Sequence, residues 1–136
     1  MLLLDTHALI WIVARAPMSS ASLVAVREAA TTGQVLVSPV SAWEIGLLAA
    51  ARRSSITFLP TPQKWLEKAL TTPGVRVTPL SPEAAIQAAF LPGKLHRDPA
   101  DRLLIATARQ LGATLITRDE LILAYARRGY VDAIPC

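Results

Sequence analysis

Short apolar runs alternate with helical patterns along the chain, and this alternation constrains the fold more than any other feature of the sequence. The runs cover residues 2–4, 35–37, 75–77 and 114–117. Most of their residues are Leu, Val or Ile, and runs this short and apolar are typical of strands buried inside a sheet. Alternation of such strands with helices predicts a parallel sheet covered by helices on both faces. The expected fold class is therefore α/β, with three α/β/α layers around a central, mostly parallel twisted sheet.

Several helix starts are marked by a capping residue followed by proline. Ser38-Pro39, Ser81-Pro82 and Asp98-Pro99 each place a capping side chain directly before a proline, which is favoured at the first helical position. Other helical patterns cover residues 8–13, 19–30, 62–70 and 119–127. Residues 56–59 and 130–131 are expected to form short extended segments, the second of them as a last strand.

Length and composition point to one folded domain. The chain has 136 residues without a repeat or a long linker, so a single domain over residues 1–136 is expected. With 52% hydrophobic and 18% charged residues, the composition excludes a disordered chain. No run is apolar enough to span a membrane and no secretory signal is visible, so we expect a cytoplasmic protein without membrane contact. A lone Cys136 excludes an internal disulfide and a thiolate metal site.

The formal charge of +4, with fourteen Lys and Arg against ten Asp and Glu, favours a polyanionic partner or an acidic protein segment. A charge of this size is also ordinary for a soluble small domain. Charge alone therefore does not decide the function.

Acidic residues follow the expected strands. Asp5 comes directly after the first run, Asp119 directly after the fourth, Glu44 lies in the helix after the second, and Asp101 lies near the start of a later helix. The carboxyl ends of parallel strands meet at one edge of a sheet, where ligands gather. Helix capping is the competing explanation: it accounts for Asp5, Asp98 and Asp119 taken singly.

Two further patterns match capping boxes. They are the segments from Ser41 to Glu44 and from Thr117 to Glu120. If they act in this way, these residues stabilise helix starts and carry no chemistry.

Glu44 and Asp101 resist the capping explanation. Glu44 shares a helical stripe with Val40, Leu47 and Leu48, so its carboxylate is expected to start from a packed apolar face. Asp101 heads a stripe that faces the sheet, while Asp98 already suffices as the cap. A buried charge needs a partner.

Carboxylates gathered at one edge need positive charge. Two of them about 4 Å apart repel by roughly 4 kcal/mol at an effective dielectric constant of 20. Divalent cations with oxygen ligands offset this repulsion, and Mg²⁺ or Mn²⁺ suits a site made of carboxylates and water. His7 and His96 lack the spacing of a zinc motif and are expected to be surface or hydrogen-bonding residues.

The acids lie in four segments: LLDTHAL at 3–9, VSPVSAWEI at 37–45, HRDPADRLLIA at 96–106 and LITRD at 115–119. In order and spacing, these segments resemble the successive motifs of PIN-domain ribonucleases, and most closely those of VapC-type toxins from bacterial toxin–antitoxin pairs. The resemblance spans nearly the whole chain.

The resemblance implies an activity, a cofactor and partners. It implies Mg²⁺- or Mn²⁺-dependent endonucleolytic cleavage of RNA that inhibits translation, a cognate antitoxin whose tail blocks the cleft, and a homodimer or a toxin–antitoxin hetero-oligomer. The residues expected to bind metal and support catalysis are Asp5, Glu44, Asp101 and Asp119, with Asp98 and Thr117 as accessories. Arg97, Arg102 and Arg118 flank the motifs and are candidates to contact phosphate, although solvated helix ends or ion pairs explain each equally well.

Further basic and aromatic residues bear on how RNA would be held. Arg52, Arg53, Lys94 and Arg97 are candidates to hold RNA outside the cleft. The tryptophans Trp11, Trp43 and Trp65 are expected in the core or at an interface rather than stacked on bases.

Two other classes of protein compete with the nuclease. A receiver-like phosphoacceptor domain also binds Mg²⁺ at a sheet edge, but it needs adjacent acids after the first strand and a lysine after a late one. This chain has Asp5-Thr6 and Arg118 instead. A non-catalytic α/β interaction module would use the same acids only as helix caps.

Overall fold

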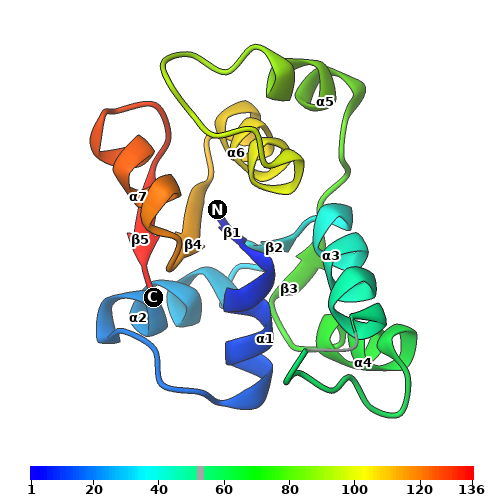
Figure 1. Ribbon diagram of the computed structural model, residues 1–136. Coiled ribbons are helices and arrows are strands. Elements are labelled where there is room, and N and C mark those ends of the chain that lie inside the picture. The colour runs from blue at the N-terminus through cyan, green and yellow to red at the C-terminus, as the bar shows by residue number, and fades with distance from the viewer. Residues whose placement is uncertain (52–53) are drawn as a thin grey trace.

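The computed structural model describes residues 1–51 and 54–136. Its strands form one parallel five-stranded sheet in the order β3-β2-β1-β4-β5 (Figure 1). Their bounds are β1 (Leu2–Leu4), β2 (Val35–Val37), β3 (Val75–Val77), β4 (Thr114–Thr117) and β5 (Ala133–Pro135). The candidates Arg52 and Arg53 lie outside the described residues.

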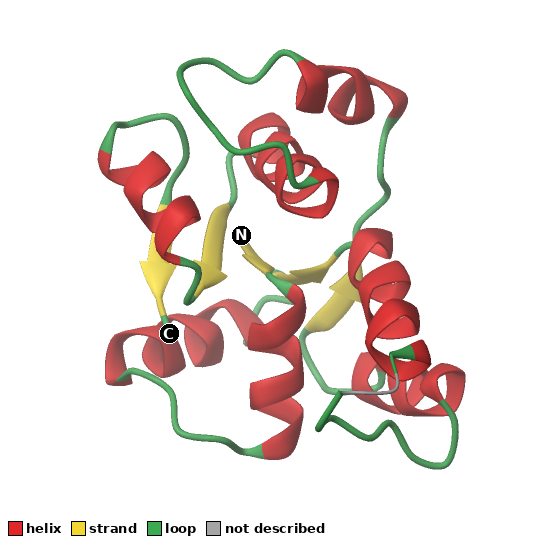
Figure 2. Ribbon diagram, viewed as in Figure 1, coloured by secondary structure: helices red, strands yellow, loops and turns green. Residues whose placement is uncertain are grey.

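Helices cover both faces of the sheet (Figure 2). Their bounds are α1 (Thr6–Ala14), α2 (Ser20–Ala30), α3 (Pro39–Ala50), α4 (Pro62–Leu70), α5 (Pro82–Ala89), α6 (Pro99–Leu111) and α7 (Glu120–Arg127). The proline starts of α3, α5 and α6 are as expected, each with its predicted capping residue. None of these helices is long and apolar enough to cross a membrane.

Alternate residues of the central strand divide the core into two layers. Leu3 points toward α5, α6 and α7, where it packs with Ile105 and Leu115. Its neighbours Leu2 and Leu4 point to the opposite face, which α1, α2 and α4 cover. Since successive side chains of a strand face opposite sides, three consecutive leucines serve both cores at once. The structure confirms the expected three-layer α/β/α fold, and every strand pairing in it is parallel.

The strand order locates the functional edge. From β1, the chain adds β2 and β3 on one side of the sheet, and β4 and β5 on the other. The order therefore reverses between β1 and β4, and a crevice forms beyond their carboxyl ends. Asp5 follows β1 and Asp119 follows β4, so the topology places both acids at this switch point.

One of the two extended segments expected from the sequence, the last strand, is wrong. The last strand is Ala133–Pro135 and not residues 130–131, because Tyr130 instead stacks on Tyr125 with ring centroids 4.8 Å apart. Residues 56–59 form no strand. There, Phe58 turns into the core and meets Trp65 edge-on at 5.0 Å between centroids.

Neither expected capping box forms. Ser38 caps α3, which leaves Ser41 buried inside the helix, and Asp119 itself caps α7 in place of Thr117. In both cases the helix start lies at a different position from the one that the box pattern requires. Glu44 is therefore free of a capping role.

Candidate active site

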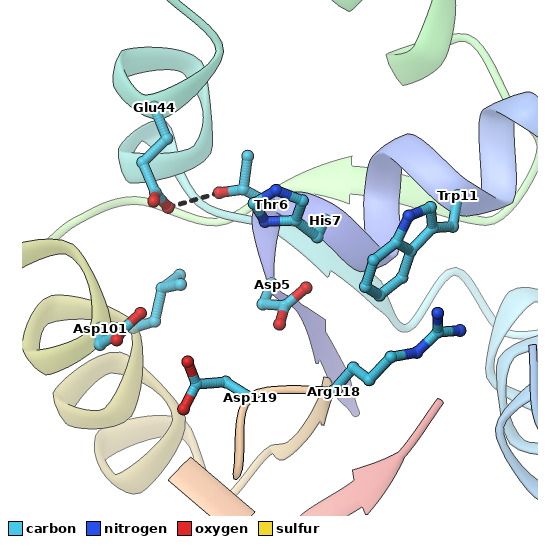
Figure 3. Close-up of a pocket in the computed structure, with 9 residues that line it drawn as sticks. Asp5, Thr6, His7, Trp11, Glu44, Asp101, Arg118 and Asp119 are labelled. Atoms are coloured by element: carbon cyan, nitrogen blue, oxygen red, sulfur yellow. Dashed lines mark hydrogen bonds between the residues drawn. The ribbon is translucent and has the colours of Figure 1, made fainter. Parts of the chain in front are cut away.

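A pocket of about 320 Å³ opens at the carboxyl ends of β1 and β4 (Figure 3). The acids Asp5, Glu44, Asp101 and Asp119 all line it. The remaining lining residues are Thr6, His7, Trp11, Leu104 and Arg118. The structure thus brings together four carboxylates that come from α3, α6 and the ends of two strands.

Asp5 is the most deeply placed of the four acids. Its Oδ1 accepts a hydrogen bond of 2.6 Å from the amide of Ala8, which makes Asp5 the cap of α1. Burial raises the pKa of Asp5, while hydrogen bonds from Thr117 and Ala8 oppose the rise. Thr117, expected as an accessory, therefore touches the site through Asp5.

Glu44 is held over the pocket by Thr6, a residue that the sequence reasoning did not single out. The Thr6 hydroxyl donates to Glu44 Oε1 at 2.5 Å (Figure 3). It also lies 3.1 Å from the Ser41 hydroxyl. These contacts join the first turn of α1 to α3. Burial raises the pKa of Glu44, and the Thr6 hydrogen bond partly offsets the rise.

The surroundings of Glu44 match the expected packed face only in part. Val40 is buried and Leu48 half-buried, but Leu47 is 52% exposed. The Thr6 contact from the start of α1 therefore adds to a face of α3 that is packed on one side of Glu44 and open on the other.

Asp101 is affected by the negative charges of all the other acids around the pocket. Burial is the largest cause that raises the pKa of Asp101, to about 7, and the neighbouring charges of Asp98, Asp119, Glu44 and Asp5 all act in the same direction. The side chain keeps 22% of its surface exposed. At neutral pH the carboxyl group is thus poised between its two protonation states.

Asp119 and Asp98 both act as helix caps. Asp119 Oδ1 accepts from the amides of Leu121 and Ile122 at 2.8 and 3.0 Å, yet the side chain still lines the pocket. Asp98 caps α6 through the amide of Asp101 at 3.0 Å and does not line the pocket. Asp98 therefore influences the site mainly through its charge.

This set of donors fits a divalent cation. Oxygen ligands dominate, and buried carboxylates with raised pKa values are what a doubly charged ion would stabilise. His96, Asp101 and Asp119 each offer one ligand atom within 4.8 Å of the others. From the sequence, His96 is expected to be a surface or hydrogen-bonding residue. Its position five residues before Asp101 is the feature that could have indicated a place beside the acids.

Of the three candidate arginines, Arg118 alone lines the pocket. Its guanidinium carbon lies 3.9 Å from the centre of the Trp11 ring. Nε donates to the carbonyl of Cys136 at 2.7 Å and Nη2 to that of Pro17 at 3.0 Å. Arg118 is thus held in a fixed orientation beside the acids (Figure 3).

Arg102 and Arg97 lie elsewhere. The Arg102 guanidinium donates to the carbonyls of Ala88, Ala89, Leu95 and His96, which ties the end of α5 and the following loop to α6. Arg97 is exposed and lies outside the pocket lining. Arg102 is not placed for the expected phosphate contact, because its guanidinium N–H groups already donate to backbone carbonyls.

Replacing Arg102 by methionine is expected to lower the free energy of unfolding by on the order of 2 kcal/mol, since hydrogen bonds from a charged donor are lost. Urea unfolding measures this change. Arg97→Met, the same substitution at an exposed position, serves as the control and should change stability by about 0.5 kcal/mol or less. Unchanged stability together with weaker, less salt-dependent RNA binding in Arg102→Met would mean that Arg102 contacts phosphate after all.

The fold and the pocket together define a parallel α/β protein with a cluster of carboxylates at its topological switch point. The family model of the PIN domain matches residues 2–128, so the chain belongs to the PIN-domain family and the resemblance in its motifs is confirmed. It is 33% identical over 118 residues to Ribonuclease VapC22 of Mycobacterium tuberculosis, an alignment that covers 86% of this chain and 85% of that protein.

Solved structures of similar fold support the architecture. VapBC2 from Rickettsia felis matches with a TM-score of 0.68 at 14% identity, over 98% of this chain and 97% of that one. FitAcB from Neisseria gonorrhoeae matches with a TM-score of 0.62 at 23% identity, over 98% and 96% of the two chains. At these identities the likeness concerns the fold.

Proposed function

We propose that this protein is a Mg²⁺- or Mn²⁺-dependent endoribonuclease and the toxin of a toxin–antitoxin pair that inhibits translation. The observation that carries the proposal is the convergence of Asp5, Glu44, Asp101 and Asp119 on one pocket. Membership of the PIN-domain family and the similarity to a protein named Ribonuclease VapC22 support the same activity.

The carboxylates are the groups that would hold the metal. A divalent cation at such a site supplies activation of water and stabilisation of negative charge on the phosphate. Thr6 fixes the Glu44 carboxylate, and the amide of Ala8 fixes one oxygen of Asp5. Carboxylates oriented in advance lose little freedom when they bind, which favours a defined coordination geometry.

Arg118 is the residue best placed to meet the charge of the RNA phosphate. Two backbone carbonyls and the Trp11 ring orient its guanidinium at the rim of the pocket. A donor oriented in this way stabilises developing charge without having to reorganise during the reaction. Arg118 also partly balances the negative charge of the acids when RNA approaches.

The partners follow from the same proposal. Two of the solved structures of similar fold are complexes with DNA. They are VapBC2 from Rickettsia felis bound to a DNA fragment from their promoter, and FitAB bound to the IR36 DNA fragment. By analogy, we infer a cognate antitoxin and a homodimer or toxin–antitoxin hetero-oligomer for this chain. The RNA substrate would reach the pocket when the antitoxin is released.

The direct test is cleavage of structured RNA by the purified protein in Mg²⁺ and in EDTA. Cleavage should require the metal and should be lost in Asp5→Asn. Activity that survives equally in EDTA and in this variant would come from a contaminant and would contradict the proposal. A protein that binds no Mn²⁺ in calorimetry would instead fit the non-catalytic interaction module.

Arg118→Gln is expected to weaken RNA binding and to reduce the slope of log K against log salt concentration by about 1, since one phosphate contact is lost. Fluorescence anisotropy with labelled RNA measures this slope, in an Asp101→Asn background so that the RNA stays intact. Arg27→Gln, an exposed arginine on α2 outside the pocket lining, is the control. Equal slopes in the two variants would exclude a specific phosphate contact for Arg118.

A further inference from the structure

His96 occupies the junction between the loop after α5 and the start of α6. Its Nδ1 accepts a hydrogen bond of 3.2 Å from the amide of Asp98. Its Nε2 lies 3.3 Å from Asp101 Oδ2. This Nε2 is shielded from solvent, and within residues 1–51 and 54–136 it is the only buried side-chain nitrogen or oxygen without a hydrogen bond. A polar atom buried in this way calls for an explanation.

The hydrogen bond from Asp98 assigns the tautomer of His96. A ring nitrogen that accepts an amide proton carries no proton of its own, so the neutral imidazole must carry its proton on Nε2. That N–H points to the side of the ring on which Asp101 lies. Since an Nε2 that bears a proton has no free lone pair, it cannot bind a metal while the contact with Asp98 persists.

The backbone around His96 is fixed to the same helix that carries Asp101. Arg102 Nη1 donates to the carbonyl of His96 at 3.2 Å, and the amide of Asp98 contacts the ring. Arg102, Asp98 and Asp101 all belong to α6 or its cap. These hydrogen bonds therefore hold the imidazole beside the Asp101 carboxylate.

We propose that His96 is a positioning residue for the metal centre, which donates Nε2–H to Asp101 Oδ2 and so leaves the other carboxylate oxygen to face the pocket. This inference rests on the proposed function, because it assumes that Asp101 binds a cation there. At 3.3 Å the contact is long and poorly aligned, and we expect it to shorten if Asp101 binds a cation.

Two substitutions separate the two nitrogens of the ring. His96→Gln keeps an N–H donor near the position of Nε2, and His96→Asn keeps an acceptor near Nδ1 that cannot reach Asp101. Calorimetric titration of Mn²⁺ into the metal-free protein is the measurement. We expect His96→Asn to weaken Mn²⁺ binding by about tenfold, the lower end of the loss found when a hydrogen-bonded partner of a ligand is removed. His96→Gln should stay within about threefold of wild type.

A structural role alone would give a different pattern. Thermal unfolding in EDTA measures the stability of each variant. If His96 only stabilises the loop, the affinity of the variants for Mn²⁺ should correlate with their stability and not with the presence of a donor at the Nε2 position. Equal Mn²⁺ affinity in wild type, His96→Asn and His96→Gln would overturn the proposal. Wild type that binds no Mn²⁺ would contradict the proposed function itself.

Pulsed electron paramagnetic resonance on bound Mn²⁺ distinguishes positioning from direct ligation. A nitrogen bound to Mn²⁺ gives a hyperfine coupling that a nitrogen behind a carboxylate does not give at that strength. We expect no directly bound nitrogen in wild type. A strong nitrogen coupling that disappears in His96→Gln would show that His96 is itself a ligand and would refute its positioning role.

Discussion

Asp101→Asn is expected to abolish RNA cleavage and, at the same time, to make the metal-free protein more stable at neutral pH. The activity should fall at least about 100-fold, the order of loss when one preorganised electrostatic group is removed from an active site. Stability should rise because an uncharged amide of the same shape avoids the cost of burying a charge and also relieves the repulsion from Asp98, Asp119, Glu44 and Asp5. Loss of function and gain of stability then share one cause.

The size of the gain follows from the pKa of Asp101. That pKa rises from 3.8 to about 7, and each pKa unit corresponds to about 1.4 kcal/mol, a figure that solvent screening reduces for a side chain that is not fully buried. We expect a gain on the order of 2 kcal/mol at pH 8 in EDTA, measured by urea unfolding. Asp132→Asn, the same change at an exposed residue outside the pocket, should leave both activity and stability near wild type. A less stable or fully active Asp101→Asn would contradict the prediction.

The metal-free wild type is expected to lose stability as the pH rises from about 4 to about 7. In this window the unfolded chain has released the Asp101 proton, while the folded protein keeps it. The folded state therefore binds more protons, and the free energy of unfolding falls with rising pH. Burial also raises the pKa of Asp5 and of Glu44, so both add to the trend in the same direction.

Mn²⁺ should reverse this trend. Its carboxylate ligands must be deprotonated, so affinity should increase between pH 6 and pH 8 as Asp101 loses its proton. At about 100 times the dissociation constant, the ion should raise the free energy of unfolding by about 2.7 kcal/mol. Urea unfolding at four pH values, with EDTA or Mn²⁺, measures both effects. The difference in the free energy of unfolding between wild type and Asp101→Asn isolates the contribution of Asp101. If this difference does not vary with pH, Asp101 is not the source of the pH dependence.

The sequence was sufficient for the features that depend on local pattern and topology. Residues 2–4, 35–37, 75–77 and 114–117 form strands with the expected bounds, because they combine apolar composition with clear helix starts nearby. Since these strands are parallel, their carboxyl ends lie at one edge of the sheet, as expected. The structure adds that β1 and β4 are neighbours, which places Asp5 near Asp119. The sequence therefore indicates the edge at which the acids gather, and the strand order decides which of them meet.

Features that depend on tertiary contacts could not be predicted in this way. The stacking of Tyr130 on Tyr125 moves the last strand three residues along the chain, and local propensity does not contain this contact. The hydroxyl of Thr6 reaches Glu44 across 38 positions in the sequence. The sequence shows that Arg102 is charged but not which groups surround it. In the structure, backbone carbonyls bind its guanidinium, so Arg102 holds the loop between α5 and α6 in place.

Three acids around the pocket, Asp5, Asp98 and Asp119, also begin helices. Asparagine begins helices as well as aspartate does. At Asp5 and Asp119, which line the pocket, exchange of one carboxylate oxygen for an amide nitrogen should therefore remove a charge proposed to hold the metal and still allow the helix to begin at the same residue.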